Sequence, residues 1–216
     1  MQHAQQCPKG GFIYERHDNL RDFFTVLLDK VCHGVKAEPH LTNLSGEVLR
    51  YKTGIKGEDA RADIKARGFW RRGEDAYFDV SFVNVNAESY KDEDTATILA
   101  GREQSKKREY GERISIEHGT FTPIVMGTNG GMGAECAMFV KTLAKKLSKV
   151  RNEELNVTMC WLRTKISFLC RRAALLCIRG SRKPWYKEGV KKVSEDFRLT
   201  VHEADLDLRM IEDDDV

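Results

Sequence analysis

The sequence predicts an α/β protein in which helices flank a central mixed β-sheet. Apolar side chains recur at helical spacing near the N-terminus and again in two long stretches of the C-terminal half. Between these stretches lie short segments rich in Val, Ile, Phe and Tyr, which are typical of strands. The expected order is helix, strand, weak strand, two strands, helix, two strands and two helices.

A first helix is expected over residues 18–33, with Asp18 as its N-cap and Gly34 as its C-terminal stop. Its apolar face holds Leu20, Phe23, Phe24, Leu27, Leu28 and Val31. A short strand is expected at 35–38, and a loop or weak strand at 42–60.

Two strands are expected over residues 61–67 and 76–85, close enough in sequence to form a hairpin. Residues 68–73 between them include two glycines and two arginines and supply the turn.

A charged helix is expected over 92–110, and two further strands at Ile114–Ile116 and 121–126. Residues 127–133 form a glycine-rich loop. The loop has neither the GK[ST] ending of a phosphate loop nor a GxGxxG pattern, so no nucleotide cofactor is expected. Backbone N–H groups at the start of the next helix are interpreted as a contact for a DNA phosphate.

Two amphipathic helices are expected at the C-terminal end of the domain. One runs from Ala137 to Val150, and the other from Leu155 to Leu176 with Gly180 as its stop. A protein-interaction module built on these two helices is one functional hypothesis.

The composition of the 216 residues, 41% hydrophobic and 32% charged, indicates one large globular domain, with or without a small appendage. The apolar runs are shorter than the ~18 residues of a membrane span, and the first residues lack the apolar stretch of a secretory signal. The six cysteines occur without a secretory signal, and four of them lie among apolar neighbours in helical patterns, so we expect a reduced, intracellular protein without membrane contact. Because no CxxC pair is present, a complete zinc ribbon or finger is excluded. The net charge of +3 does not by itself indicate a nucleic-acid binder.

Two aspartates stand at symmetric positions of the expected hairpin. Asp63 and Asp79 are equally distant from Arg71 in the turn, so they would lie opposite each other with Cβ atoms ~5 Å apart. Carboxylates in this arrangement repel unless they share a proton or hold a divalent cation. The other interpretation is that nearby arginines neutralise both acids, and a one-residue slip in register would put them on opposite faces.

This arrangement resembles the PD-(D/E)XK restriction-endonuclease-like nucleases. It is most similar to the endonuclease domain of site-targeted non-LTR retrotransposons and to related domains in cnidarian and plant retroelement-derived genes. The resembling segments are CPKGGF (7–12), RHDNLRD (16–22), ARADIKARGFW (60–70), AYFDVSFVN (76–84), KKREYGERI (106–114), GTFTPIVM (119–126) and WLRTKISF (161–168). The resemblance implies an αβββαβ core with a mixed sheet, followed here by two extra C-terminal helices.

The sequence departs from the family pattern at two positions. Ala62 stands where a proline precedes the first acid, and Ser81 stands where the family has its lysine. In the retrotransposon-type domain the lysine comes instead from the following helix, with a tyrosine shortly after it. Lys106, Lys107 and Tyr110 fit that description, and the choice between the two lysines stays open.

The resemblance implies that Asp63 and Asp79, with the backbone carbonyl of Val80, hold Mg²⁺ or Mn²⁺. The helix lysine and Tyr110 would assist phosphodiester hydrolysis. The accessory candidates are His17, Asp18 or Asp22, and Gln104. For His17 taken alone, the favoured interpretation is a surface residue beside an N-cap.

Five basic residues surround the expected hairpin and suit a DNA phosphate track: Arg61, Lys65, Arg67, Arg71 and Arg72. Phe69 and Trp70 lie at the hairpin tip, where a solvated turn with packing aromatic side chains is the other interpretation.

His3 and Cys7 resemble the last two ligands of the CCHC zinc knuckle that precedes the nuclease in such retroelement proteins. The first two ligands are missing, and a structural zinc needs four, so zinc is not expected in this fragment. The expected organisation is therefore a knuckle remnant at 1–12, an endonuclease-like domain at 13–182 and an extension with an acidic tail at 183–216.

The sequence thus leads to the hypothesis of a Mg²⁺-dependent DNA endonuclease of retroelement origin. Its implied partners are DNA and, in a longer polyprotein, a reverse transcriptase region. The resemblance also implies a nuclear location. The alternative is a catalytically inactive relic that binds DNA or has a structural role.

Overall fold

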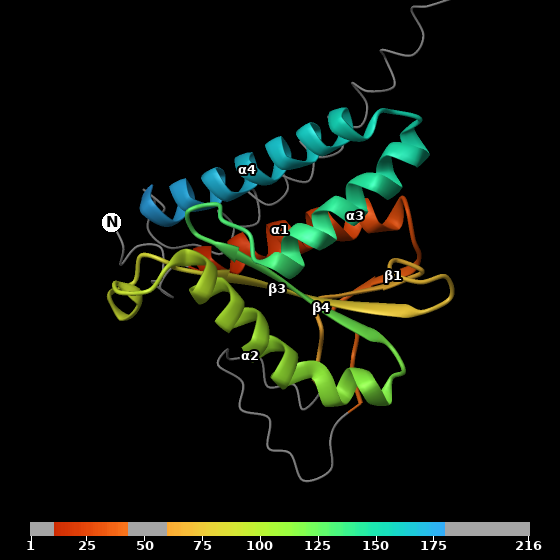
Figure 1. Ribbon diagram of the computed structural model, residues 1–216, viewed down its shortest axis with the longest axis horizontal. Coiled ribbons are helices and arrows are strands. Elements are labelled where there is room, and N and C mark those ends of the chain that lie inside the picture. Colours follow the sequence, from red (N-terminus) through yellow and green to blue (C-terminus); the bar gives the residue numbers. More distant parts are fainter. Residues whose placement is uncertain (1–10, 43–59, 180–216) are drawn as a thin grey trace, which may run out of the picture.

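The computed structural model describes residues 11–42 and 60–179 of the chain (Figure 1). It contains α1 (Phe12–Asp29), β1 (His33–Ala37), β2 (Ile64–Arg67), β3 (Asp75–Val83), the 3₁₀ helix η2 (Glu88–Tyr90), α2 (Thr95–Ile116), β4 (Thr120–Gly127), α3 (Ala134–Arg151) and α4 (Leu155–Arg179). In this described part of the chain, no helix is both long and apolar enough to span a membrane.

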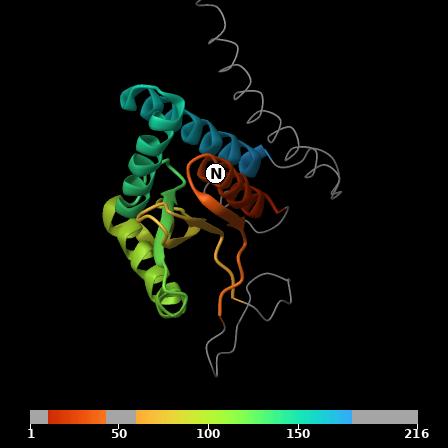
Figure 2. The same ribbon diagram turned by 90° about the vertical axis from the view of Figure 1, so that its right-hand side faces the viewer.

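The four strands form one mixed sheet in the order β1-β2-β3-β4. β1, β2 and β3 pair antiparallel, whereas β4 pairs parallel to β3. The parallel pair requires a crossover connection, and α2 supplies it. Figures 1 and 2 show α1 and α3 on one face of the sheet and α2 on the other, with α4 outside α1 and α3.

The main core lies between the sheet and the helices α1 and α3. Aromatic rings from three elements and a turn meet there, and the ring centroids of Phe78 and Phe139 are 5.0 Å apart. Phe24 and Phe69 pack edge-on or tilted against the same Phe139 ring. This packing fixes β3 against α1 and α3.

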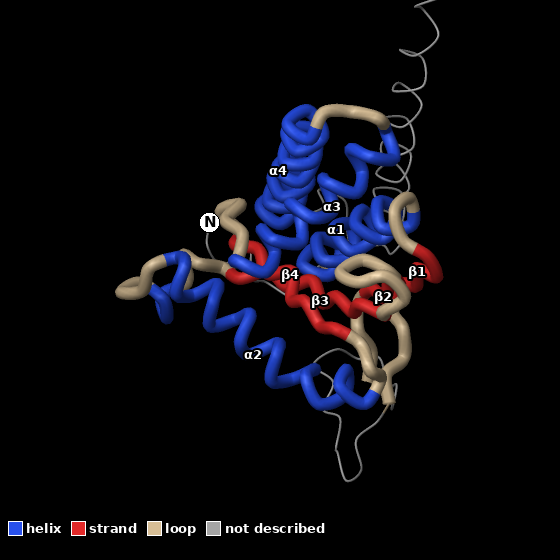
Figure 3. Tube along the Cα trace, turned by 45° about the vertical axis from the view of Figure 1, so that its right-hand side comes forward, coloured by secondary structure: helices blue, strands red, loops and turns tan. Residues whose placement is uncertain are grey.

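Side chains alternate across β3 and divide it into two faces. Phe78 and Val80 enter the main core. Tyr77 instead packs with Ile114 of α2, and Asp79 contacts the same helix. The side chains at the odd positions of β3 therefore face α2. Figure 3 shows α2 on one side of the sheet and α1, α3 and α4 on the other.

The structure confirms a mixed sheet flanked by helices and followed by two C-terminal helices. It also corrects the expected start of the first helix. α1 begins at Phe12 after Gly11, whose φ of 75° is left-handed, so Asp18 lies inside the helix and is not its N-cap. The helix ends at Asp29, before the expected stop at Gly34.

The expected strand at Ile114–Ile116 is wrong, because these residues form the last turn of α2. Ile114 is buried against Tyr77 and Leu41, whereas Ile116 is exposed. Two isoleucines two positions apart match a strand pattern, but only the first enters the core. Most of the expected weak strand at 42–60 lies outside the described residues.

Candidate functional site

Asp63 and Asp79 lie opposite each other on neighbouring chain segments. Ile64 pairs with Phe78 in the β2–β3 ladder, so the next position along the ladder places Asp63 against Asp79. The Asp63 backbone N–H donates to the Phe78 carbonyl at 3.1 Å, which continues the pairing beyond β2. The structure has the register that the hairpin symmetry predicted.

Asp79 is a buried carboxylate with a lysine from α2 against it. Its residue is 4% exposed, and Nζ of Lys106 lies 3.1 Å from both carboxylate oxygens. Burial raises the pKa of Asp79 to about 6; Lys106 opposes this shift, and the nearby negative charge of Asp63 adds to it. Even beside Lys106, the buried Asp79 carboxylate is therefore less stable as an anion than an exposed aspartate.

Tyr110 completes this side of the site, one turn after Lys106 on α2. Its hydroxyl lies within hydrogen-bonding reach of Asp79, and Nζ of Lys106 is 5.2 Å from the centre of its ring. The ring stacks on Phe121 of β4, with centroids 5.0 Å apart. Burial, together with the charge of Asp79, raises the pKa of Tyr110, so the phenol remains protonated.

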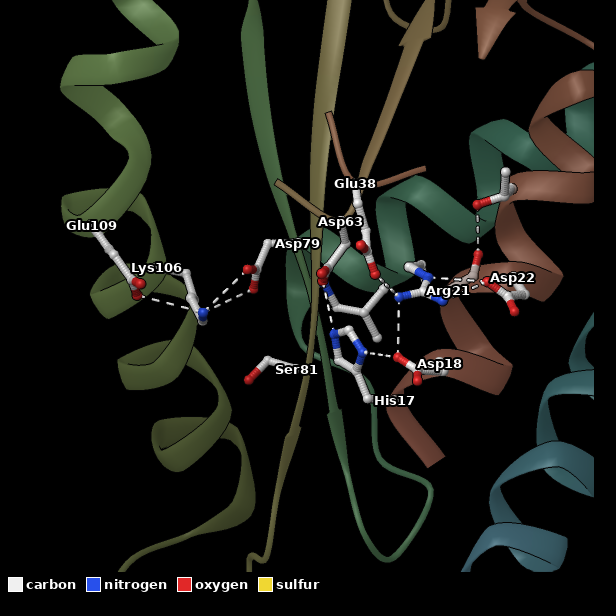
Figure 4. Close-up of polar contacts among 12 residues, drawn as sticks. His17, Asp18, Arg21, Asp22, Glu38, Asp63, Asp79, Ser81, Lys106 and Glu109 are labelled. Atoms are coloured by element: carbon white, nitrogen blue, oxygen red, sulfur yellow. Dashed lines mark hydrogen bonds and ion pairs between the residues drawn. The ribbon is translucent and has the colours of Figure 1, made fainter. Parts of the chain in front are cut away.

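His17 approaches Asp63 from α1, on the opposite side of the acid pair (Figure 4). Its Nε2 is 2.9 Å from Oδ2 of Asp63, and its Nδ1 is 3.1 Å from Oδ1 of Asp18. The Val80 backbone N–H also donates to Oδ2 of Asp63, at 2.6 Å. Burial alone would lower the pKa of His17, but the hydrogen bonds and charges of Asp18 and Asp63 outweigh it and raise that pKa to about 10.

His17 is therefore a cation at neutral pH, and its contribution to stability is expected to depend on pH. Because its folded pKa of about 10 exceeds the ordinary 6.5, the stabilisation is complete below pH 6.5 and is lost as the pH rises toward 10. In the absence of metal, His17→Gln is expected to lower the free energy of unfolding by roughly 1–3 kcal/mol at pH 6, the range of charged hydrogen bonds.

Urea unfolding of both proteins at pH 6, 8 and 9.5, with a chelator present, measures this difference. The difference is expected to shrink steadily with pH. A constant difference across the three pH values would show that the imidazole is not held as a cation.

Arg21 forms ion pairs with three acids near His17. It contacts Asp18 at 3.1 Å and Asp22 at 2.9 Å, and it also contacts Glu38. Figure 4 shows Arg21 between Asp22 and the acid pair. The structure thus places Asp22, an expected accessory residue, with Arg21 and not beside Asp79.

The structure also distinguishes the two candidate lysines. Lys106 contacts Asp79, whereas Nζ of Lys107 pairs with Glu135 at the start of α3. Gln104, another expected accessory residue, is exposed on α2. Ser81 accepts a hydrogen bond from Arg102 at 3.0 Å.

Glu103 links α2 to the first turn of α3. Its buried carboxylate accepts the Glu135 backbone N–H at 2.9 Å and also the Cys136 N–H, which caps the helix from outside. This use of the N–H groups corrects our interpretation that they contact a DNA phosphate. The link fixes the rotation of α2 and therefore the position of Lys106.

Gly133 leaves the space that Glu103 occupies, because a Cβ at Gly133 would collide with the Glu103 carboxylate. Gly133→Ala is expected to displace this cap and lower the free energy of unfolding by about 1–2 kcal/mol. Gly101→Ala is the matched control, since Gly101 is helical and a Cβ there meets nothing within 4 Å. The free energy of unfolding of this control, measured with urea, is expected to rise by about 0.5–1 kcal/mol. Equal effects of both variants would contradict the capping role.

The structure gives three of the five expected DNA-contacting residues a partner within the protein and leaves Arg71 and Arg72 exposed. Arg61 is 3.7 Å from Glu38, and Lys65 is 2.8 Å from Asp75. Arg67 donates to the Gly73 carbonyl, and Arg71 and Arg72 are exposed at the hairpin tip.

The aromatic residues of the hairpin tip pack into the protein. Phe69 is buried in the main core, and Nε1 of Trp70 donates to Thr122 at 2.9 Å. The structure therefore favours the packing interpretation for these two rings.

Asp63 and Asp79 alone do not supply enough ligands to coordinate a metal ion fully. Across residues 11–42 and 60–179, no three His, Cys, Asp or Glu side chains converge in a way that could hold a metal ion. A cation between Asp63 and Asp79 would need backbone oxygens and water to complete its coordination. His3 and Cys7 lie outside the described residues.

Sequence reasoning underestimated His17 and missed Glu103 and Arg102. The signal for His17 was its spacing of three and seven residues from Leu20 and Phe24, which places it on the same face of α1. No comparable signal exists for Glu103, since its partner lies 32 residues away in the chain.

Comparison of the chain with protein-family models and with curated proteins finds no match.

Proposed function

We propose that the chain is a metal-dependent DNA endonuclease domain with a restriction-endonuclease-like core of retroelement origin. One observation carries this proposal. Two acids, Asp63 and Asp79, stand opposite each other on adjacent segments of the sheet, and Lys106 from the following helix reaches the buried one. Paired acids and a lysine form the pattern of phosphodiester hydrolysis in that family.

The order of the elements supports the proposal. α1, β1, β2, β3, α2 and β4 follow one another as in the αβββαβ core expected from the resemblance. The lysine comes from α2, as in the retrotransposon-type domain, and Ser81 occupies the usual lysine position.

The chemistry of the donors fits Mg²⁺ or Mn²⁺. Both ions prefer carboxylate oxygens and retain several waters, so few protein ligands suffice. Asp63 and Asp79, with the Val80 carbonyl, would hold such an ion. Two adjacent carboxylates, one of them buried with a raised pKa, are stabilised by a divalent charge. The bound ion would neutralise the scissile phosphate and make a bound water more acidic.

The remaining residues orient this site and supply positive charge. The Val80 N–H and His17 hold Oδ2 of Asp63 in place. Lys106 neutralises Asp79 here and can turn its ammonium group to a phosphate oxygen when Asp79 is neutralised in another way. Tyr110 restricts the motion of Lys106 through the face of its ring.

A second candidate function is a catalytically inactive relic that retains DNA binding or a structural role. Each acid already has its own cation in the structure, His17 for Asp63 and Lys106 for Asp79. Acids that are neutralised in this way need no metal ion for stability.

The test is nicking of supercoiled plasmid by the full chain with Mg²⁺, with Mn²⁺ or with chelator. The nuclease proposal expects open-circular product with either metal and none with chelator. DNA affinity without cleavage under either metal would support the relic. An oligomer in light scattering without DNA affinity would support an interaction module. DNA, a reverse transcriptase region in a longer protein and a nuclear location are proposals that depend on the first outcome.

A further inference from the structure

Helix α4 has apolar side chains on two opposite faces. Leu162 and Ile166 are buried on its inner face, which packs on α1 and α3. On the outer face, Val157 is 54%, Phe168 66% and Leu175 56% exposed. These outer residues lie eleven and seven positions apart and share one side of the helix with Ile178, three positions after Leu175.

This outer stripe is unusual for a helix at the surface. A helix that is apolar on both faces is normally buried on both faces, and a continuous exposed apolar stripe marks a contact surface. A surface hollow follows the same stripe, and its described walls, which include Cys160, Arg163 and Phe168, all belong to α4. Figure 1 shows α4 outside α1 and α3, on their side of the sheet.

The sequence beyond α4 contains a segment of matching pattern. Apolar residues recur at helical spacing through residues 190–211: Val190, Val193, Phe197, Val201, Ala204, Leu208 and Ile211. Polar and acidic residues occupy most of the other positions. Residues 180–216 lie outside the described structure, so only their sequence enters the argument.

The apolar positions of the two segments match at both ends of an antiparallel pairing. If the segment runs antiparallel to α4, Val190 and Val193 meet Ile178 and Leu175 near the C-terminal end of α4. In the same register Leu208 meets Cys160, and Ile211 meets Val157. Residues 180–189, which include Pro184 and Gly189, remain for the connection.

The charges of the two segments also differ. α4 carries five basic residues and no acidic one over Leu155–Arg179. Residues 190–211 carry five acidic and four basic residues, and four further acidic residues follow at 212–215. Opposite charges beside an apolar seam favour this pairing over pairing of two copies of α4, which would bring basic helices together.

We propose that residues 190–211 form an amphipathic helix that docks antiparallel on the outer face of α4 within the same chain. This contact is independent of the nuclease proposal, because none of the site residues lies on α4. It covers the apolar stripe and brings acidic residues beside the basic surface of α4.

Cys160 is a native probe for this contact, because it is an exposed free cysteine on the outer stripe. The experiment measures its alkylation by N-ethylmaleimide in the full chain, with peptide mass spectrometry to identify the site. The docked segment is expected to slow this labelling about tenfold or more relative to a variant with Val193→Asp and Leu208→Asp. The matched control carries Leu199→Asp and Leu206→Asp, which lie on the opposite side of the expected helix.

Slow labelling in the wild type and the control, with fast labelling in the first variant, supports the proposal. Fast labelling of all three proteins overturns it. Slow labelling that depends on protein concentration, with a dimer mass in light scattering, also overturns it, because a second copy then covers α4. Slow labelling of all three proteins at every concentration overturns it as well.

Discussion

The Asp79→Asn variant is expected to lose Mg²⁺-dependent nicking by about 10³-fold, which corresponds to about 4 kcal/mol of transition-state stabilisation. The substitution keeps the shape of the side chain but removes one of the two carboxylate charges that would hold the metal ion. Lys106 still has Glu109 at 3.4 Å, so the variant leaves no isolated buried cation. We therefore expect its free energy of unfolding to stay within about 1 kcal/mol of the wild type.

Asp75→Asn is the matched control for this experiment. Asp75 lies on the same strand and the same face as Asp79, but its partner is Lys65 at 2.8 Å. We expect the control to nick plasmid at nearly the wild-type rate. If Asp79→Asn nicks plasmid at the wild-type rate, Asp79 is not part of the active site. Equal losses of activity in both variants would indicate a general effect on the strand.

Lys106→Met is expected to lose both activity and stability. The substitution leaves the buried Asp79 carboxylate, which is 4% exposed, without its cation. Removal of one partner of a buried ion pair lowers the free energy of unfolding by about 3–5 kcal/mol. Burial already raises the pKa of Asp79 to about 6, and loss of Lys106 raises it further. Stability of the variant is therefore highest below the ordinary pKa of 3.8 and falls as the pH rises through the folded pKa.

Urea unfolding at pH 5 and pH 8 measures this effect. Lys107→Met is the matched control, because Lys107 is half exposed and its pairing with Glu135 is worth at most about 1 kcal/mol. The double variant Asp79→Asn, Lys106→Met is expected to recover most of the lost stability, since it removes both charges. A Lys106→Met protein as stable as the Lys107→Met protein at pH 8 would contradict the buried pairing.

The pairing of the two acids could be predicted because a hairpin register follows from local symmetry. Once the turn is centred on Arg71, antiparallel pairing alone sets Asp63 against Asp79. The choice between Lys106 and Lys107 could not be predicted in this way. The two lysines are about 100° apart around α2, and the rotation of that helix depends on tertiary contacts such as the Glu103 cap.

The role of His17 was hidden by the misplaced start of α1. With Asp18 as the N-cap, His17 would precede the helix, whereas the helix begins at Phe12 and directs His17 to Asp63. Gly11 is the local reason for the earlier start, since its left-handed φ turns the chain into the helix. Helix boundaries of this kind depend on backbone geometry that an apolar stripe starting at Leu20 does not reveal.

The most direct test of the central claim is Mn²⁺ binding to the full chain, followed by electron paramagnetic resonance. Asp63 and Asp79 are expected to bind one Mn²⁺ per chain in competition with Mg²⁺, and Asp63→Asn or Asp79→Asn should each abolish that binding, whereas Asp75→Asn should leave it intact. A wild-type chain that binds no Mn²⁺, or binding that survives both site substitutions, would contradict the claim that these two carboxylates form a metal site.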